Sequence, residues 1–320
     1  MSTTPKSNHL FTGVHAFDEN SAFVRGVLRD LDEKRVPHTF VMRSMDERWS
    51  RYFIHNNVTA QCTIHKPRRQ TLSLCVDGVI HIDSDDGSRT EHVDPGEAGP
   101  NLRRWMWDIR PIGGSVYAVG MLRMVYKRGD DERWVRFSQG LEIRSPDEVD
   151  AGLRSIDGIS EDSVYAVGLH GEIWHCNGER WTRRESPTNV RLERVRCFGP
   201  ALAYACGGAG IILRAENDQW SVVEQDETKE TFWDMAFFAG RLFLATTEAL
   251  YVLSANQQLS KIDIPVGRPV ATNYLAANKR TLWSVGGRDI LVFNGDRWTI
   301  PSHPLDERAP RPPGSTGQSA

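Results

Sequence analysis

Short apolar runs separated by polar turns recur along most of the chain and predict a repeated β-structure. In each repeat an apolar strand ends in a small residue or glycine, a second apolar strand follows a short turn, and a polar turn leads to tryptophan. The four clearest copies are residues 115–134, 163–181, 202–220 and 281–298. Their apolar residues alternate or form short runs, as in strands, and no window has sustained helical periodicity. Residues 71–93 and 241–259 are weaker copies, and 38–49 keeps only the second half.

The repeat has the length of a propeller blade. Its closing positions recur about every 40 residues, the period of four-stranded blades. They are Trp49, His92, Trp134, Trp181, Trp220, Leu259 and Trp298, each expected at the start of the outermost strand. An inner strand precedes each pair, at 106–109, 153–156, 192–195, 232–235 and 271–274. We therefore predict an all-β fold, a closed seven-bladed β-propeller of four-stranded antiparallel blades, because radial packing buries both faces of each sheet.

These boundaries give one propeller domain over residues 1–308. The expected blades are approximately 10–55, 58–93, 104–137, 152–184, 190–224, 231–264 and 270–302. The apolar stretch 22–28 fits the second strand of the first blade, and first-blade strands are expected to lie beside the last blade to close the ring. The segment 309–320 is rich in proline, glycine and serine and is predicted to be a disordered tail.

Tryptophan repeats at the closing position in five of the seven units. One interpretation is a set of aromatic platforms for sugars, and the other is one large ring per blade packed between the sheets. We favour the second, because a residue that repeats in most blades serves the architecture.

The turns before these tryptophans resemble a degenerate Asp-box, S-x-D-x-G-x-x-W. The segment Ser84-Asp85-Asp86-Gly87-Ser88 comes nearest to that pattern. Together with the pattern VYAVG…GEIWHCNGERWT, over roughly residues 38–300, the chain resembles bacterial seven-bladed propellers of the WD40, photosystem-assembly-factor-like and sialidase-like superfold. The resemblance implies that the boxes are structural and distant from any active site. Some members of this set look like immunity or accessory proteins that neutralise a secreted toxin.

Composition narrows the class of partner. The formal net charge is -3 and gives no general reason to expect nucleic acid or an anionic membrane. No apolar run is long enough for a transmembrane helix, and the N-terminus lacks the apolar core of a secretory signal. The cysteines are odd in number and form no CxxC pair, so we expect reduced thiols and a cytoplasmic location. They are Cys62, Cys75, Cys176, Cys197 and Cys206.

The sequence carries no recognisable catalytic motif. The histidines form neither HExxH nor another close ligand set, and there is no P-loop and no serine nucleophile elbow. Asp108 and Asp234 occupy equivalent inner-strand positions in blades expected to face each other across the ring. That separation is too large for a simple acid–base pair, so a structural role is favoured. We expect no enzyme activity, no cofactor and no metal site.

Binding is expected where variable loops meet on a rigid scaffold. Trp107, Arg154, Glu193 and Trp233 stand at the entrances of inner strands. The turns between the second and third strands carry a further set, from which we select Arg123, His170, Glu248, Arg288 and Asp289. Tryptophan and arginine are favoured anchors of protein interfaces. The connections 93–104 and 138–152 are long and could form one raised wall of a site.

The sequence therefore favours a protein-binding scaffold that is a monomer when unbound. The resemblance adds the possibility of an immunity or accessory protein whose partner is a toxin or effector. The alternative is a carbohydrate-binding or glycoside-hydrolase propeller, and a lyase or metal-dependent propeller enzyme is a third class.

Overall fold

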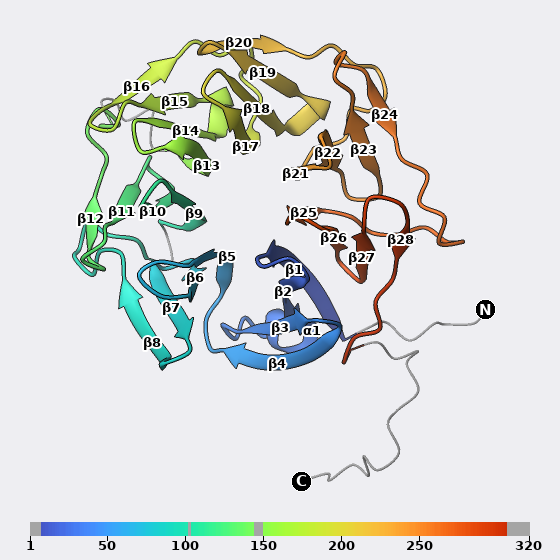
Figure 1. Cartoon of the computed structure of the whole chain (residues 1–320). Helices are drawn as coiled ribbons and strands as arrows, with labels where there is room; N and C mark the ends of the chain where they lie inside the picture. The colour runs from blue at the N-terminus through green and yellow to red at the C-terminus, as the bar shows by residue number, and fades with distance from the viewer. Residues whose placement is uncertain (1–7, 102–103, 144–149, 306–320) are drawn as a thin grey trace.

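Seven sheets of four antiparallel strands stand around a central axis and form a closed ring (Figure 1). The computed structural model describes residues 8–101, 104–143 and 150–305. In every sheet the strands lie in chain order, from the innermost strand at the axis to the outermost at the rim. The predicted seven-bladed β-propeller is confirmed. The predicted tail, 309–320, lies outside the described residues.

The first three blades include the one short α-helix of the described residues. Blade 1 has β1 (His9–Ala16), β2 (Ser21–Leu28), the helix α1 (Arg29–Glu33), β3 (Thr39–Met45) and β4 (Arg48–Ile54). Blade 2 has β5 (Val58–Ile64), β6 (Gln70–Cys75), β7 (Val79–Ser84) and β8 (Gly87–His92). Blade 3 has β9 (Met106–Ile112), β10 (Ser115–Gly120), β11 (Val125–Arg128) and β12 (Trp134–Arg136).

The remaining four blades repeat the same plan, two of them with a 3₁₀ turn between the second and third strands. Blade 4 has β13 (Leu153–Ser160), β14 (Ser163–Gly168), η2 (Leu169–Gly171), β15 (Ile173–Cys176) and β16 (Trp181–Arg184). Blade 5 has β17 (Leu192–Gly199), β18 (Leu202–Gly207), η3 (Gly208–Gly210), β19 (Ile212–Glu216) and β20 (Gln219–Val222). Blade 6 has β21 (Asp234–Phe238), β22 (Arg241–Ala245), β23 (Leu250–Leu253) and β24 (Leu259–Lys261). Blade 7 has β25 (Tyr274–Ala277), β26 (Leu282–Gly286), β27 (Asp289–Phe293) and β28 (Trp298–Thr299).

Two local predictions need correction. His92 ends β8 instead of beginning it, because a tight turn pairs Ser84 directly with Gly87 and starts the outer strand earlier. The inner strand expected at 271–274 begins only at Tyr274. The residues before it leave the strand because the Ala271 amide donates to Asp289 Oδ2 at 2.9 Å and does not enter the sheet.

The five repeated tryptophans belong to the apolar layers of the propeller, which confirms the structural interpretation. Trp181 is 1% exposed. The others pack against apolar clusters whose members come mainly from adjacent blades; they are Trp49, Trp134, Trp220 and Trp298. The indole N–H of Trp181 donates to the Phe137 carbonyl at 2.9 Å, so burial does not leave that group unsatisfied.

Blades 1 and 7 close the ring without exchanging a strand, since each sheet contains only consecutive strands. The Phe11 amide of β1 donates to the Gly287 carbonyl at 3.0 Å. Phe11 and Phe40 pack with Trp283 of the last blade in one apolar cluster. The expected placement of first-blade strands beside the last blade is therefore confirmed.

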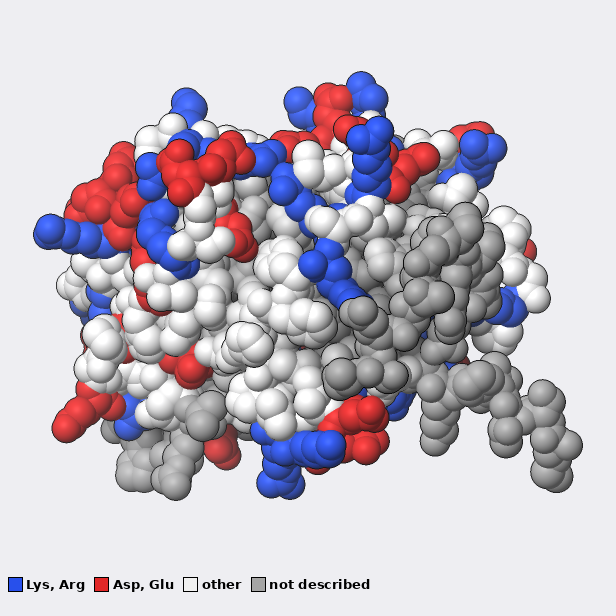
Figure 2. All heavy atoms as spheres, turned by 90° about the horizontal axis from the view of Figure 1, so that it is seen from below, with Lys and Arg blue, Asp and Glu red and all other residues white. Residues whose placement is uncertain are grey.

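The strand order defines two faces of the ring. In an antiparallel four-stranded blade, the start of the first strand, the turn between the second and third, and the end of the fourth lie at the same end. We call this end the loop face. Seen edge-on, acidic and basic side chains lie beside one another and do not form separate fields (Figure 2). Within the described ranges, no helix is long and apolar enough to span a membrane.

Candidate functional site

Four of the predicted binding residues occupy the same place in consecutive blades of the loop face. Trp107 lies in β9, Arg154 in β13, Glu193 in β17, and Trp233 directly precedes β21. The residue before each one is fully buried, and these are Met106, Leu153, Leu192 and Phe232. Neighbouring side chains of an extended chain point in opposite directions, so the second position is turned out of the apolar layer.

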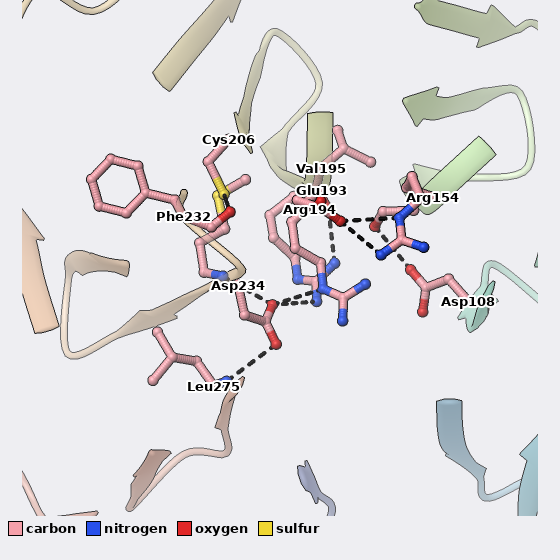
Figure 3. Close-up of polar contacts among 12 residues, drawn as sticks. Asp108, Arg154, Glu193, Arg194, Val195, Cys206, Phe232, Asp234 and Leu275 are labelled. Atoms are coloured by element: carbon pink, nitrogen blue, oxygen red, sulfur yellow. Dashed lines mark hydrogen bonds and ion pairs between the residues drawn. The ribbon is translucent and has the colours of Figure 1, made fainter. Parts of the chain in front are cut away.

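The structure joins these four side chains into one continuous row. The Arg154 guanidinium lies 3.8 Å from the centre of the Trp107 ring. It also donates to Glu193 Oε2, from Nε at 3.0 Å and from Nη2 at 2.8 Å (Figure 3). Arg191 pairs with the other oxygen of Glu193, and its guanidinium lies 5.8 Å from the Trp233 ring centre. We call Trp107, Arg154, Glu193, Arg191 and Trp233 the aromatic–arginine strip.

Arg191 was missed at the level of sequence, although it stands only two residues before Glu193. The available signal was a second arginine beside an inner-strand acid, but the pattern did not show that both arginines share one carboxylate. Trp105, also missed, extends the row, because its ring centre lies 5.4 Å from that of Trp107 and its side chain is exposed.

The strip has an excess of positive charge, since two guanidinium groups share a single carboxylate. Glu193 is 2% exposed, whereas the side chains of Arg154 and Arg191 are 21% and 45% exposed. Desolvation lowers the pKa of Arg154, and the Glu193 carboxylate opposes that effect. A buried ion pair contributes little net stability compared with an apolar replacement, but it orients the groups that remain accessible. The ion pairs therefore hold two guanidinium groups beside two half-buried indole rings.

Two other predicted residues are occupied by contacts within the chain. Arg123 is 3% exposed, donates from Nε to Glu172 Oε2 at 2.8 Å, and lies 5.1 Å from the centre of the Trp174 ring. Asp289 is 7% exposed and binds the Arg268 side chain and the Ala271 amide. Both side chains bind neighbouring segments of the loop face. Because they are buried, they are poorly placed to contact a partner.

The remaining predicted residues, His170, Glu248 and Arg288, are exposed in the turns of blades 4, 6 and 7. They lie on the loop face with the strip, but within the described ranges no hydrogen bond or ion pair joins them to it or to each other. The structure thus brings together Trp107, Arg154, Glu193 and Trp233, and leaves the three turn residues separate.

Aspartates on the inner strands connect successive blades around the channel. Asp108 Oδ2 accepts the Ile156 amide at 3.3 Å, and Asp157 Oδ2 accepts the Cys197 amide at 2.9 Å. Asp234 Oδ2 accepts the Leu275 amide at 3.1 Å (Figure 3). We call Asp108, Asp157 and Asp234 the inter-blade aspartates. Each carboxylate lies on one blade and holds the inner strand of the next, which is the structural role favoured for Asp108 and Asp234.

Other candidates for chemistry are sparse in the part of the chain that the structure describes. Its histidine, cysteine, aspartate and glutamate side chains form no group of three that could hold a metal ion. The five cysteines are unpaired thiols. Burial raises the pKa of Cys62 to about 12, so this thiol stays protonated at neutral pH.

Solved structures support the propeller architecture. The chain is similar to the WD40 propeller domain of Doa1, with a TM-score of 0.66 and 12% identity over 89% of this chain and 94% of that one. It is also similar to YCF48 bound to D1 peptide, with a TM-score of 0.65 and 13% identity over 90% of this chain and 92% of that one. At these identities the similarity concerns the fold, and it confirms the resemblance drawn from the turns and repeats.

Sequence comparison gives a narrower result. No family model matches the chain. Among curated proteins it is similar to the Immune protein Tsi7 of Pseudomonas aeruginosa strain PAO1, with 31% identity over 293 residues, 90% of this chain and 95% of the relative. The predicted immunity function is supported by a relative that matches along nearly its whole length. The chain therefore belongs to the family of the Immune protein Tsi7.

Proposed function

We propose that this protein is a non-catalytic immunity protein that binds a toxin protein in the cytoplasm and thereby neutralises it. Membership of the Tsi7 family carries this proposal. The five unpaired cysteines support a reducing compartment, where disulfides are rare. A rigid ring with diversified loops suits stoichiometric binding, because its surface is organised before the partner arrives and little ordering is needed.

We place the centre of the interface at the aromatic–arginine strip. Trp107 and Trp233 offer flat apolar rings, and Arg154 and Arg191 offer guanidinium groups held by Glu193. Tryptophan and arginine are enriched among residues that dominate binding energy at protein interfaces. The preorganised ion pairs reduce the side-chain entropy lost on binding. The excess positive charge of the strip favours an acidic patch on the toxin.

The channel supports the non-catalytic part of the proposal. The inter-blade aspartates accept hydrogen bonds from backbone amides of the next blade, so these carboxylates have a structural role in the folded ring. A toxin would be inhibited by coverage of its surface, without a chemical step performed by the propeller.

The decisive experiment pairs the protein with any toxin candidate that a neighbouring gene encodes. Co-expression is expected to restore growth of cells that the toxin alone arrests, and the purified pair should form a stoichiometric complex. Arg154→Ala and Trp107→Ala are expected to weaken binding about 30-fold or more, which corresponds to roughly 2 kcal/mol or more per hot-spot residue.

Matched controls separate the strip from the rest of the loop face. Glu248→Ala and Arg288→Ala change exposed side chains in other turns of the same face and should alter affinity less than about threefold, as near-neutral contacts do. Tight binding that neither strip variant weakens would move the interface elsewhere. Absence of both binding and protection, with a correctly folded protein, would contradict the immunity function towards that toxin.

A further inference from the structure

The central channel contains a charged cavity that the proposed toxin interface does not use. Its volume is about 260 Å³, and it lies farther along the inner strands than the aromatic–arginine strip. Seven charged residues line it: Arg25, Arg110, Arg194, Arg196, Asp108, Asp157 and Asp234. The cavity is small beside the ~300–1,000 Å³ of sites for drug-sized ligands. It suits a ligand of a few heavy atoms.

The three carboxylates in this cavity are already satisfied by the chain. Both oxygens of Asp108 accept backbone amides, from Ile109 and Ile156. Asp157 accepts Arg110 on one oxygen and the Cys197 amide on the other. Asp234 likewise has hydrogen-bond donors on both oxygens, among them Arg194 Nε at 2.9 Å and the Leu275 amide.

Arg25 differs from the other arginines of the cavity. It comes from β2, the second strand of blade 1, and reaches the channel past Gly13 of β1. A Cβ atom at position 13 would lie 2.1 Å from the Arg25 guanidinium carbon, so the glycine is what leaves room for this side chain. The strand pairing shifts by one residue between Phe11 and Gly13, as at a β-bulge. The local backbone is therefore shaped around a buried guanidinium.

Arg25 has no carboxylate partner within the described residues. It is 5% exposed, and its one hydrogen bond runs from Nη2 to the Thr59 carbonyl at 2.6 Å. Its Nε atom is buried without an acceptor. A buried charge that lacks both a direct ion pair and a full set of hydrogen bonds is costly, so a feature of this kind calls for an explanation.

The charge balance of the cavity also indicates that Arg25 lacks a partner of opposite charge in direct contact. Four guanidinium groups face three carboxylates. Burial, reinforced by Arg110 and Arg25, lowers the pKa of nearby His15 to about 3, so its imidazole is neutral at physiological pH. Burial lowers the pKa of Arg25 to about 10, which leaves it protonated at neutral pH. The lining therefore carries one more positive than negative charge, and Asp234 and Asp108 raise the pKa of Arg25 without forming an ion pair with it.

We propose that the channel cavity is a binding site for a small oxyanion, a carboxylate or phosphate group, with Arg25 as its principal ligand. The planar fork of a guanidinium matches both kinds of oxyanion, and a single negative charge would neutralise the excess. The anion would supply the hydrogen-bond acceptor that Arg25 Nε lacks. It would also connect blade 1 to the opposite wall of the channel, where Arg194 and Arg196 lie. This site is independent of the proposed toxin interface.

Binding is tested on the full chain with two probes, malonate and inorganic phosphate, each against sodium chloride of equal ionic strength and pH. We expect at least one probe to bind saturably in calorimetry and to raise the melting temperature with concentration, because a ligand that binds the folded state stabilises it. Binding of malonate alone identifies a carboxylate site, binding of phosphate alone a phosphate site, and binding of both an unselective oxyanion site.

Arg25→Gln should weaken that binding at least tenfold, and Arg25→Lys should retain part of it because it keeps the charge without the fork. The matched control is Arg288→Gln, an exposed arginine of the loop face, which should leave anion affinity unchanged. Each variant is first checked for a native circular dichroism spectrum.

A second measurement keeps the proposal falsifiable if the Arg25 variants do not fold. A crystal structure of the unmodified protein grown with the bound probe should show the anion within hydrogen-bond distance of Arg25. Failure of both probes to bind saturably, equal binding by the wild type and a folded Arg25→Gln protein, or anion density only outside the channel would overturn the proposal. None of these outcomes depends on whether the toxin binds.

Discussion

The seams between blades are built in two different ways. On the side of the ring formed by blades 3 to 7, the inter-blade aspartates accept amides of the next inner strand at three seams. At the seam between blades 7 and 1, the main contact is packing between aromatic side chains. Phe11 and Phe40 meet Trp283 there, and one backbone hydrogen bond runs from Phe11 to Gly287.

The difference follows from how the chain connects the blades. Consecutive blades are joined directly by one connecting segment, so bringing them together costs less loop entropy than joining the two ends of the chain, and a directional hydrogen bond sets the register. Blades 7 and 1 must meet without such a link; Asn278 donates to the Asp18 carbonyl from 260 positions away. Non-directional burial of large apolar rings is the larger driving force for that closure.

The strongest test of this comparison removes one inter-blade aspartate. Asp234→Ala deletes the acceptor of Arg194 and of the Leu275 amide and leaves a partly buried guanidinium without its carboxylate. We expect the free energy of unfolding to fall by about 3–5 kcal/mol, as when one partner of a buried ion pair is lost. Urea denaturation measures the change. The control is Asp296→Ala, in an exposed turn. An equal loss there would contradict the role of Asp234 in joining blades 6 and 7.

The terminal seam is probed by a smaller apolar side chain. Phe11→Leu removes aromatic contacts with Phe40 and the seam cluster, and we expect a loss of about 1–2 kcal/mol from lost burial and a partly filled cavity. Phe53→Leu changes a 43% exposed ring of the same blade and should cost under about 0.5 kcal/mol. Equal effects of the two changes, compared by thermal and urea denaturation, would show that aromatic closure at this seam is unimportant.

Stability should also depend on pH through His15, on the wall of blade 1. The folded-state pKa lies near 3, below the unfolded value of 6.5, so the unfolded chain binds the extra proton between these values. Stability is therefore present above about pH 6.5 and is lost as the pH falls towards 3. The loss is at most about 1.4 kcal/mol per pH unit for one group, less where solvent screens it.

Replacing His15 by glutamine should flatten the decline in stability between pH 6.5 and 5.5, followed by urea denaturation at each pH. The matched variant His170→Gln, in an exposed turn of blade 4, should keep the wild-type slope. A His15→Gln slope identical to that of the wild type would mean that other groups account for the acid sensitivity.

The smallest effect is expected for the exposed ion pair of the terminal seam. Arg280 Nη2 lies 2.7 Å from Glu19 Oε2, but the two side chains are 61% and 54% exposed. Arg280→Ala should change the free energy of unfolding by less than about 0.5 kcal/mol, and the difference should shrink at high salt. A loss above about 1 kcal/mol would show that surface charge pairs, in addition to aromatic packing, hold the ring closed.

The architecture could be predicted because its signals are local and repeated. A strand, a turn and a tryptophan every forty or so residues specify one blade, and seven copies leave ring closure as the way to cover every sheet. Equivalent positions in successive repeats also located Trp107, Arg154, Glu193 and Trp233 beside the channel. One of the weaker copies was misplaced in detail: His92 was assigned to the wrong end of its strand, because blade 2 has a tighter turn and no tryptophan.

Pairing between blades could not be derived in the same way, because it joins residues far apart in the chain. Arg123 looked like an exposed turn residue until its partner Glu172, 49 positions away, was in view. Arg25 is one polar residue in the predicted apolar strand 22–28, and only the folded ring places it in the channel beyond Gly13, without an ion pair within the described residues. Local pattern thus determines which blades form, whereas burial and charge balance are properties of the packed ring as a whole.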